Sequence, residues 1–495
     1  MLLRAHAAIW LNPGTGGTLG RLLISSVRRA SVVVGLVLVA VIAPTPAALA
    51  RGREPQMRVL LLENTQLSLR SDGAQPLRVQ GLPGGERRPQ RLQLSLQGTR
   101  LSANVDGRSM ALRPSTLLTV QNDDPRGIWL GSRRYRGVLR ISGRGGRLRV
   151  VNSLGIETYL ASVVGSEMPH RWPLAALQAQ AVAARTYALK QRSRGGAWDV
   201  KATVASQVYR GVESETPSTL QAVASTRALV LVHGGRLIDA VFHSSSGGVT
   251  EASGMVWRRQ HPYLVSVPDH DQHSPVHRWE QWFDPSGLRQ RLPETGGLQA
   301  VEVLSRSGSG RVRQARLRGP RGSLVLSGGE LRKRLGLKST LVSFEMVTGG
   351  QRPPAAFPVR SGTTQASSGS RIDRITAAVA RQGPGRPPLL VAPPPVLVSK
   401  ASVGRWSGSG LQLLVKGQGY GHGVGMSQWG AHGLAEQGAD FRAILQHYYR
   451  GAEVVPYRPH FDPSLALKPP TKPLWREAQV SPFGPVSLSF AAPLQ

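Results

Sequence analysis

Apolar and polar residues alternate in short runs between Val59 and about Val151. Turn residues separate the runs, among them Asp106-Gly107 and the Gly-Arg-Gly-Gly segment at 143–146. Strict alternation predicts strands with one buried face, and Asp-Gly between two such runs predicts a tight hairpin. We therefore expect residues 51–151 to form a β-rich N-terminal region without helices.

Helical spacing begins after residue 151. GIETYLASVVG predicts a short helix that ends at Gly165, and residues 172–192 predict a long helix with Pro173 in its first turn. The apolar stripe of the long helix consists of Leu174, Leu177, Ala181 and Ala188. Gln178 and Arg185 fall within this stripe, where polar groups are costly unless they face a partner or a cleft.

Strands return between residues 200 and 345, with one more helix expected over 218–232. GRVRQARLRGPRGSLVLSG predicts two strands joined at Gly-Pro. We assign residues 152–348 to the core of the protein, and residues 349–410, rich in Gly, Pro, Ser and Arg, to a linker or insertion.

Residues 411–455 complete the core, and residues 456–495 form a Pro-rich tail. This part contains a glycine-rich motif, a helix from about Ser427 and a second helix that ends at Gly451. The whole pattern indicates an α+β fold, mostly antiparallel β, with a central long helix and C-terminal helices.

In the motif GQGYGHGVGMSQWGAHG (417–433), glycine occupies every odd position from 417 to 425. In an extended chain, one face would be bare backbone and the other would carry Tyr420 and His422. Glycine weakens a strand, so we expect a ligand or another part of the protein to lie close to the bare face. Tyr420 and His422 are candidates for contact with a sugar ring, and ordinary aromatic packing is the alternative. Ser427 is placed to cap the following helix.

The charge and the first residues narrow the possible partners. A length of 495 residues predicts two or three domains, and a formal charge of +34 favours an anionic partner, whether nucleic acid, phospholipid or acidic polysaccharide. Three arginines precede the short apolar run 30–43, and an Ala-Leu-Ala cleavage site follows at 48–50, so residues 1–50 resemble a signal peptide. An uncleaved anchor is the alternative, and the membrane is a partner only in that case. Both interpretations place the body of the protein in the periplasm or cell wall of a bacterial envelope, which argues against nucleic acid.

The chain contains no cysteine, which excludes disulfides, thiolate nucleophiles and thiolate metal sites. One loop, HPYLVSVPDHDQHSPVH, gathers the residues His261, His270, His273, His277, Asp269 and Asp271. Their spacing is irregular for a metal site, so we expect neither a metal nor a cofactor, with a structural metal as the alternative.

Glu167 is the candidate catalytic acid. It lies in the connector between the two predicted helices, beside Met168, Trp172 and Pro173. Apolar neighbours raise the pKa of a carboxyl group and keep it protonated near neutrality, as a general acid requires. The alternative is an ordinary acid near a helix N-terminus.

Ordinary glycosidases need two carboxylates, and no second acid lies near Glu167 or in the glycine-rich motif. The nearest others, which we expect to be solvated, are Glu157, Asp199, Glu213 and Glu215. One acid suffices if the substrate supplies its own nucleophile. In peptidoglycan, the C6 hydroxyl of muramic acid can attack its own C1 to form a 1,6-anhydro product.

Two blocks of the chain resemble the signature blocks of the SpoIID/LytB family. They are VVGSEMPHRWPLAALQAQAVAARTYAL and KGQGYGHGVGMSQWGAHGLAEQGADFRAILQHYYRG. SQVYRGV, FHSSSGGVTEAS, HPYLVSV and LSGGELRKRLGLKST add to the resemblance, which covers residues 58–455 apart from the linker. Family members often have lysine at the position of Gln178, and some relatives hold zinc through cysteines near the HSSSGG turn, which this chain lacks.

The resemblance implies a lytic transglycosylase that cleaves peptidoglycan glycan strands stripped of stem peptides. By motif position it makes Glu167 the acid, with the supporting residues Arg185, Gln178, His243, Tyr420, His422 and Gln428. The LytB branch implies the alternative, a non-catalytic wall-binding protein that enhances an N-acetylmuramoyl-L-alanine amidase. We expect Tyr420 and His422 to face Glu167 and Arg185 across one groove.

Overall fold

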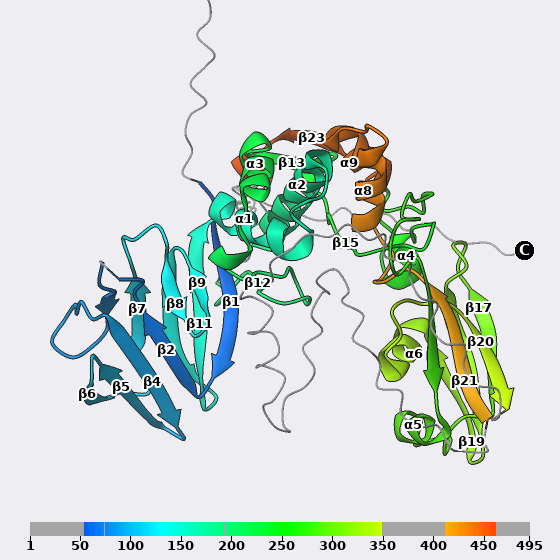
Figure 1. Ribbon diagram of the computed structural model, residues 1–495, viewed down its shortest axis with the longest axis horizontal. Helices are drawn as coiled ribbons and strands as arrows, with labels where there is room; N and C mark the ends of the chain where they lie inside the picture. The colour runs from blue at the N-terminus through cyan, green and yellow to red at the C-terminus, as the bar shows by residue number, and fades with distance from the viewer. Residues whose placement is uncertain (1–53, 74, 193–194, 349–410, 462–495) are drawn as a thin grey trace, which may run out of the picture. The chain divides into compact units, whose positions relative to one another are not determined.

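The computed structural model describes residues 54–73, 75–192, 195–348 and 411–461. The predicted signal peptide, the linker at 349–410 and most of the Pro-rich tail lie outside the described residues. Antiparallel sheets combined with helices confirm the predicted α+β fold (Figure 1). No helix in these ranges is long and apolar enough to cross a membrane.

The N-terminal part consists of two six-stranded sheets whose apolar faces contribute to one hydrophobic core. The first sheet, in spatial order, is β12 (Val200–Lys201), β1 (Gln56–Asn64), β11 (Arg147–Gly155), β10 (Val138–Arg144), β7 (Leu117–Gln121) and β3 (Arg78–Gln80). The second is β6 (Arg108–Leu112), β5 (Arg100–Val105), β4 (Arg91–Gln97), β2 (Gln66–Arg70), β8 (Ile128–Leu130) and β9 (Arg133–Tyr135). The predicted hairpin joins β5 to β6, with φ of 48° at Asp106 and 92° at Gly107.

Three helices follow the first sheet: α1 (Ile156–Glu167), α2 (Leu174–Lys190) and α3 (Pro217–Ser225). α2 packs against α1, α3, α8, α9 and β13, so nearly all of its faces are buried (Figure 1). The sequence predicted a single buried stripe on this helix, but the buried surface of α2 extends well beyond that stripe. The prediction that Gly165 ends the preceding helix is wrong, because α1 continues to Glu167. Gly165 instead lets α1 approach the backbone carbonyl of Ser214.

The helix expected over 218–232 is only half present. It ends at Ser225, and β13 (Leu229–His233) begins after Ala228, whose φ is 59°. β13 lies between β14 (Arg236–Leu237) and β23 (Glu453–Pro456). Three consecutive residues of β13 are buried, as expected for a strand that is paired on both sides. A continuous apolar run of this kind has no period that separates a strand from a buried helix, so the sequence pattern predicted a helix here.

A second hydrophobic core lies under two three-stranded sheets. One contains β16 (Arg278–Phe283), β21 (Leu411–Gln418) and β20 (Leu341–Thr348); the other contains β17 (Ala300–Arg306), β18 (Val312–Gly319) and β19 (Gly322–Ser327). The helices α5 (Pro285–Arg291) and α6 (Gly328–Leu335) accompany these sheets. β18 and β19 confirm the predicted pair of strands joined at Gly-Pro.

The C-terminal helices are α8 (Gln428–Glu436) and α9 (Phe441–Tyr448). Ser427 caps α8 as predicted, since its hydroxyl accepts a hydrogen bond from the backbone of Gly430 at 3.2 Å. α9 ends at Tyr448, three residues before the predicted Gly451. The remaining short elements are η1 (Val212–Ser214), β15 (Phe242–His243), α4 (Ser253–Val256), β22 (Met426–Ser427) and η3 (Pro459–Phe461).

Candidate active site

Glu167 is the last residue of α1, and both of its carboxylate oxygens accept hydrogen bonds. Oε1 accepts from the backbone N–H of Val208 at 2.7 Å, and Oε2 accepts from the side-chain amide of Gln428 at 3.3 Å. Burial raises the pKa of Glu167 from 4.5 to about 6, although the two hydrogen bonds and the charge of Arg210 act in the opposite direction. Glu167 therefore exchanges its proton closer to neutrality than an exposed carboxylate does.

The local sequence explains how Glu167 is placed. The backbone turns to an extended conformation at Met168, whose N–H donates to the carbonyl of Val164 at 2.9 Å, and Pro169 follows. The helix cannot continue through this Met-Pro step, so Glu167 ends it. Gln428 is the first residue of α8, and α2 packs against both α1 and α8.

Arg210 is a site residue that the sequence reasoning missed. It is half-buried, and its charge acts on Glu167. Within the described ranges it forms no hydrogen bond or ion pair, and burial lowers its pKa. The signal was its position in SQVYRGV, two residues after Val208, but the sequence alone did not show that this segment meets Glu167.

An aromatic cluster joins the connector that follows Glu167 to α8. Trp172 was predicted as an apolar neighbour of Glu167, but its contacts with Trp429 and His432 on α8 were missed. The ring of Trp172 lies 4.8 Å from that of Trp429 and 4.7 Å from that of His432, measured between centroids. All three side chains are partly exposed. Partly exposed aromatic rings can stack on a pyranose, and Trp172 and Trp429 lie on the two segments that supply Glu167 and Gln428.

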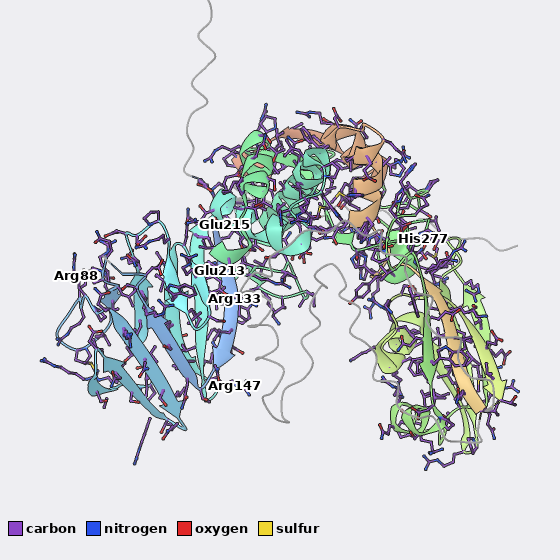
Figure 2. All side chains as sticks on the ribbon, viewed as in Figure 1. Arg88, Arg133, Arg147, Glu213, Glu215 and His277 are labelled. Atoms are coloured by element: carbon purple, nitrogen blue, oxygen red, sulfur yellow. The ribbon has the colours of Figure 1, made fainter. Side chains whose placement is uncertain are left out.

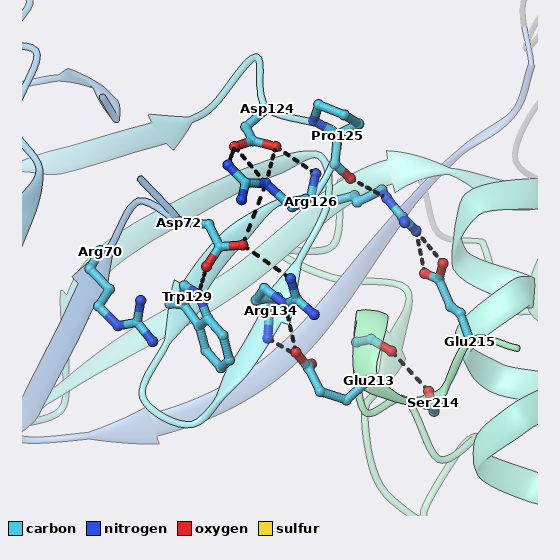
Figure 3. A network of polar contacts seen from close by, with 12 residues as sticks. Arg70, Asp72, Asp124, Pro125, Arg126, Trp129, Arg134, Glu213, Ser214 and Glu215 are labelled. Carbon is cyan, nitrogen blue, oxygen red and sulfur yellow. Dashed lines mark hydrogen bonds and ion pairs between the residues drawn. The ribbon is translucent and has the colours of Figure 1, made fainter. Parts of the chain in front are cut away.

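The other carboxylates considered as partners of Glu167 are engaged elsewhere, so the expectation that they are solvated is wrong. Glu213 and Glu215, in and just after η1, lie next to the N-terminal strands (Figure 2). Glu213 pairs with Arg134, and Glu215 pairs with Arg136 (Figure 3). The other two ion pairs are Asp199 with Arg58 and Glu157 with Arg185. No carboxylate among the described residues contributes to the pKa shift of Glu167.

Arg185 and Gln178 do not lie at Glu167. The guanidinium of Arg185 is 1% exposed and binds Glu157 through Nη2 at 2.6 Å and Nε at 3.0 Å. The expectation that Arg185 faces the same groove as Glu167 therefore fails, because it is an interior ion pair. Gln178 is half-buried, and its amide donates to the hydroxyl of Ser225 on α3 at 2.9 Å.

His243, His422 and Tyr420 gather around a different point. The rings of His243 and His422 lie 5.4 Å apart, and Trp257 lies 5.3 Å from His422. The backbone of Tyr420 pairs with Ser245, and its side chain packs against the second core. Among the described residues, no contact joins Tyr420 or His422 to Glu167. The motif reaches Glu167 through Gln428 instead.

Burial leaves both histidines neutral near pH 7. The pKa of His422 falls to about 4, mainly through burial and then through the charge of Arg332. The pKa of His243 is also lowered well below its usual value, chiefly by burial. His243 Nδ1 donates to the carbonyl of Val424 at 3.1 Å, as the neutral tautomer permits.

The glycines of the motif make room for other parts of the protein. Beyond Gln418 the chain is not an extended strand, because Gly419, Gly421, Gly423 and Gly425 all have positive φ. A Cβ at each odd position would clash with a neighbour: Trp279 at 417, Ser245 and Ser246 at 419, His243 at 421, Arg311 at 423, and Val241 at 425. The close approach expected at this motif is therefore made by the protein itself.

The two aspartates of the histidine-rich loop brace the turn at 243–248. Asp271 accepts from the backbone of Gly247 at 2.7 Å and of Gly248 at 2.9 Å, and it also binds His277. Asp269 accepts from Tyr448 at 2.5 Å and from Ser246. Across the described ranges, no group of three or more histidine or acidic residues is arranged to hold a metal.

The sequence is similar to one family model and to several proteins of known name. Residues 144–233 match the family model described as SpoIID: Stage II sporulation protein. The chain is 32% identical to the Amidase enhancer of Bacillus subtilis (strain 168) over 305 residues, which are 60% of this chain and 40% of that protein. It is 28% identical to Stage II sporulation protein D of Bacillus amyloliquefaciens over 325 residues, which are 61% of this chain and 75% of that protein.

Stage II sporulation protein D of Bacillus subtilis (strain 168) is 27% identical over 324 residues, again 75% of that protein. The chain thus spans about 40% of the length of the amidase enhancer that it matches. These matches support a SpoIID family assignment, and the resemblance predicted from the sequence is confirmed.

Proposed function

We propose that the protein is an exported lytic transglycosylase that cleaves the glycan strands of peptidoglycan during cell-wall remodelling. The observation that carries the proposal is the environment of Glu167, a single acid with a pKa of about 6. Its two oxygens are held by Val208 and Gln428, and no second carboxylate is in contact with it among the described residues. The relatives named Stage II sporulation protein D and Amidase enhancer support a role at the cell wall.

In the proposed reaction, protonated Glu167 gives its proton to the glycosidic oxygen as the C1–O4 bond breaks. The C6 hydroxyl of the same muramic residue then forms a bond to C1, and Glu167, now a carboxylate, accepts the hydroxyl proton. The products are a free 4-hydroxyl and a 1,6-anhydro ring, and no water is consumed. A pKa near 6 suits both proton transfers, because Glu167 must first donate a proton to the glycosidic oxygen and then accept one from the C6 hydroxyl, close to neutral pH.

The residues around Glu167 have proposed roles in holding the strand. Gln428 and Val208 fix the carboxyl group, so its proton points away from both donors. Trp172 and Trp429 supply a stacking surface for the sugars. Arg210, half-buried and without a partner in the described ranges, is placed to bind an acidic group of the substrate.

A non-catalytic enhancer of a wall amidase is the second candidate. Its support is the 32% identity to a relative named Amidase enhancer. For this role, Glu167 would be only a structural acid, and the protein would act through contact with its partner hydrolase.

One experiment separates the two functions. Purified protein is incubated with defined glycan strands, with and without stem peptides, and the products are read by mass spectrometry. The transglycosylase predicts 1,6-anhydro products from strands without stem peptides. An enhancer predicts no sugar product from the protein alone, together with faster peptide release when a wall amidase is added.

A further inference from the structure

A cavity of about 510 Å³ lies apart from the Glu167 site. Its lining includes Arg311, Arg313, Arg332, Glu251 and His422, and it includes none of the residues that touch Glu167. It is formed where the glycine-rich motif meets β18 and α6. Nothing in the proposed transglycosylase reaction uses it.

The walls of this cavity carry an excess of positive charge. Three arginines face one acid, Glu251, and none of the three forms an ion pair within the described ranges. Glu251 is 2% exposed and already accepts hydrogen bonds from Ser309 at 2.8 Å and from its neighbour Ala252 at 3.0 Å. Glu251 therefore forms no ion pair with the three arginines, although its charge and the charges of Asp269 and Asp271 act on Arg311.

Arg311 is the most buried of these cations, at 3% exposure. Its Nη2 donates to the carbonyls of Ser246 at 2.7 Å and Val249 at 2.9 Å, and its Nη1 donates to Ser309 at 2.8 Å. Its Nε is buried and has no acceptor. The charges of Glu251, Asp269 and Asp271 offset part of the cost of burying Arg311. Arg332 is half-buried, burial lowers its pKa, and no carboxylate of the described residues acts on it, so an anionic ligand would supply the missing negative charge there.

An exposed apolar surface adjoins the cationic wall. Met255 and Val256 line the cavity and are 45% and 41% exposed. The next residue, Trp257, is 42% exposed, and its ring lies 5.3 Å from that of His422. An indole, a thioether and an isopropyl group together suit the apolar face of a sugar ring, and a small inorganic anion would not use them.

We propose that this cavity binds a carboxylated sugar unit of a glycan. Arg313 and Arg332 hold the carboxylate, with Arg311 behind them, and the Trp257 surface packs against the ring. Gly328 and Gly329, in the first turn of α6, form another part of the cavity wall. The inference does not depend on catalysis by Glu167, because the site contains no residue of that centre.

The test is calorimetric titration of the full chain with N-acetylmuramic acid, with neutral N-acetylglucosamine and with inorganic phosphate. We expect N-acetylmuramic acid to bind at least about tenfold more tightly than the neutral sugar, since charge-assisted hydrogen bonds are the strong ones. Arg313→Gln and Arg332→Gln are each expected to weaken this binding by about tenfold. Arg313 is exposed, so its variant is expected to fold.

Arg316→Gln is the matched control, because Arg316 lies on the same strand, binds Glu302 and does not line the cavity. Arg316→Gln should bind the sugar acid as the wild type does. Trp257→Ala should lower the affinity for N-acetylmuramic acid several-fold and leave any binding of phosphate unchanged. Equal affinities for phosphate and the sugar acid, or unchanged binding in both Arg313→Gln and Arg332→Gln, would overturn the proposal.

Discussion

Gln428 donates a hydrogen bond from its side-chain amide to Oε2 of Glu167 at 3.3 Å, across 261 positions of the chain. This contact joins the glycine-rich motif to the connector that holds the acid. It exists because α2 packs against both α1, which ends at Glu167, and α8, which begins at Gln428. The two blocks that resemble one family are thus in direct contact.

Gln428→Ala should raise the pKa of Glu167 further. The amide donor stabilises the carboxylate, so its loss favours the protonated form. A carbon-13 titration of the Glu167 carboxyl group measures the shift directly. Gln437→Ala, on the exposed end of the same helix, should leave the titration unchanged. An unaltered pKa in Gln428→Ala would show that the contact does not tune the acid.

Glu167→Gln should stabilise the protein at high pH and not at low pH. The folded pKa of about 6 lies above the value of 4.5 expected for the unfolded chain, so folding binds the proton more tightly. The wild type therefore loses stability as the pH rises from about 4.5 to 6, and the loss approaches about 2 kcal/mol above that window.

Denaturant unfolding at pH 4 and pH 8 measures this difference. The difference in the free energy of unfolding between Glu167→Gln and the wild type should be larger at pH 8 than at pH 4. Glu302→Gln is the control, because a hydrogen bond from Arg316 lowers the pKa of that carboxyl group, and the same gain at high pH is not expected. An equal gap at both pH values would contradict a raised pKa at Glu167.

Arg185→Met should destabilise the fold by about 3 kcal/mol, because it leaves the largely buried Glu157 without its partner. The double variant Glu157→Gln/Arg185→Met should recover at least about 1 kcal/mol of this loss. Chemical denaturation of the two single variants, the double variant and the wild type forms the cycle. A variant of Arg185 with wild-type stability but no activity would instead indicate a direct role at the site.

Gly425→Ala should destabilise the protein by about 3 kcal/mol or more, since a Cβ there would lie 2.2 Å from the carbonyl oxygen of Val241 and φ is 71°. Gly438 has a φ of 89° but open space around the Cβ position. Gly438→Ala should therefore cost only the backbone strain, about 1 kcal/mol. Equal losses in the two variants would mean that conformation alone, and not close packing, explains the motif.

The sequence predicted the elements whose signals are local. Alternation located the N-terminal strands, Asp106-Gly107 located a hairpin, and Ser427 located the start of α8. β13 was missed because a buried, continuous apolar run satisfies both a helix and a central strand. Its pairing with β23, more than 200 residues later, decides the outcome.

The candidate site was predictable only in part, for the same reason. Glu167 stood out because an acid lies among apolar neighbours beside a Met-Pro step. The polar residue Arg185 on an apolar stripe correctly indicated a partner, but that partner is Glu157 in the interior. The effect of Arg210 on Glu167 and the contact of Trp172 with Trp429 were not predicted, because each depends on contacts between distant segments.

The most direct test of the account is the product formed by Glu167→Gln from glycan strands without stem peptides. Wild-type protein and Glu302→Gln should release 1,6-anhydro products detectable by mass spectrometry, and Glu167→Gln should release at least about a hundredfold less, as expected on loss of a general acid. Circular dichroism and unfolding would show that the variant is folded. Full release of anhydro products by folded Glu167→Gln would contradict the central claim that Glu167 is the acid.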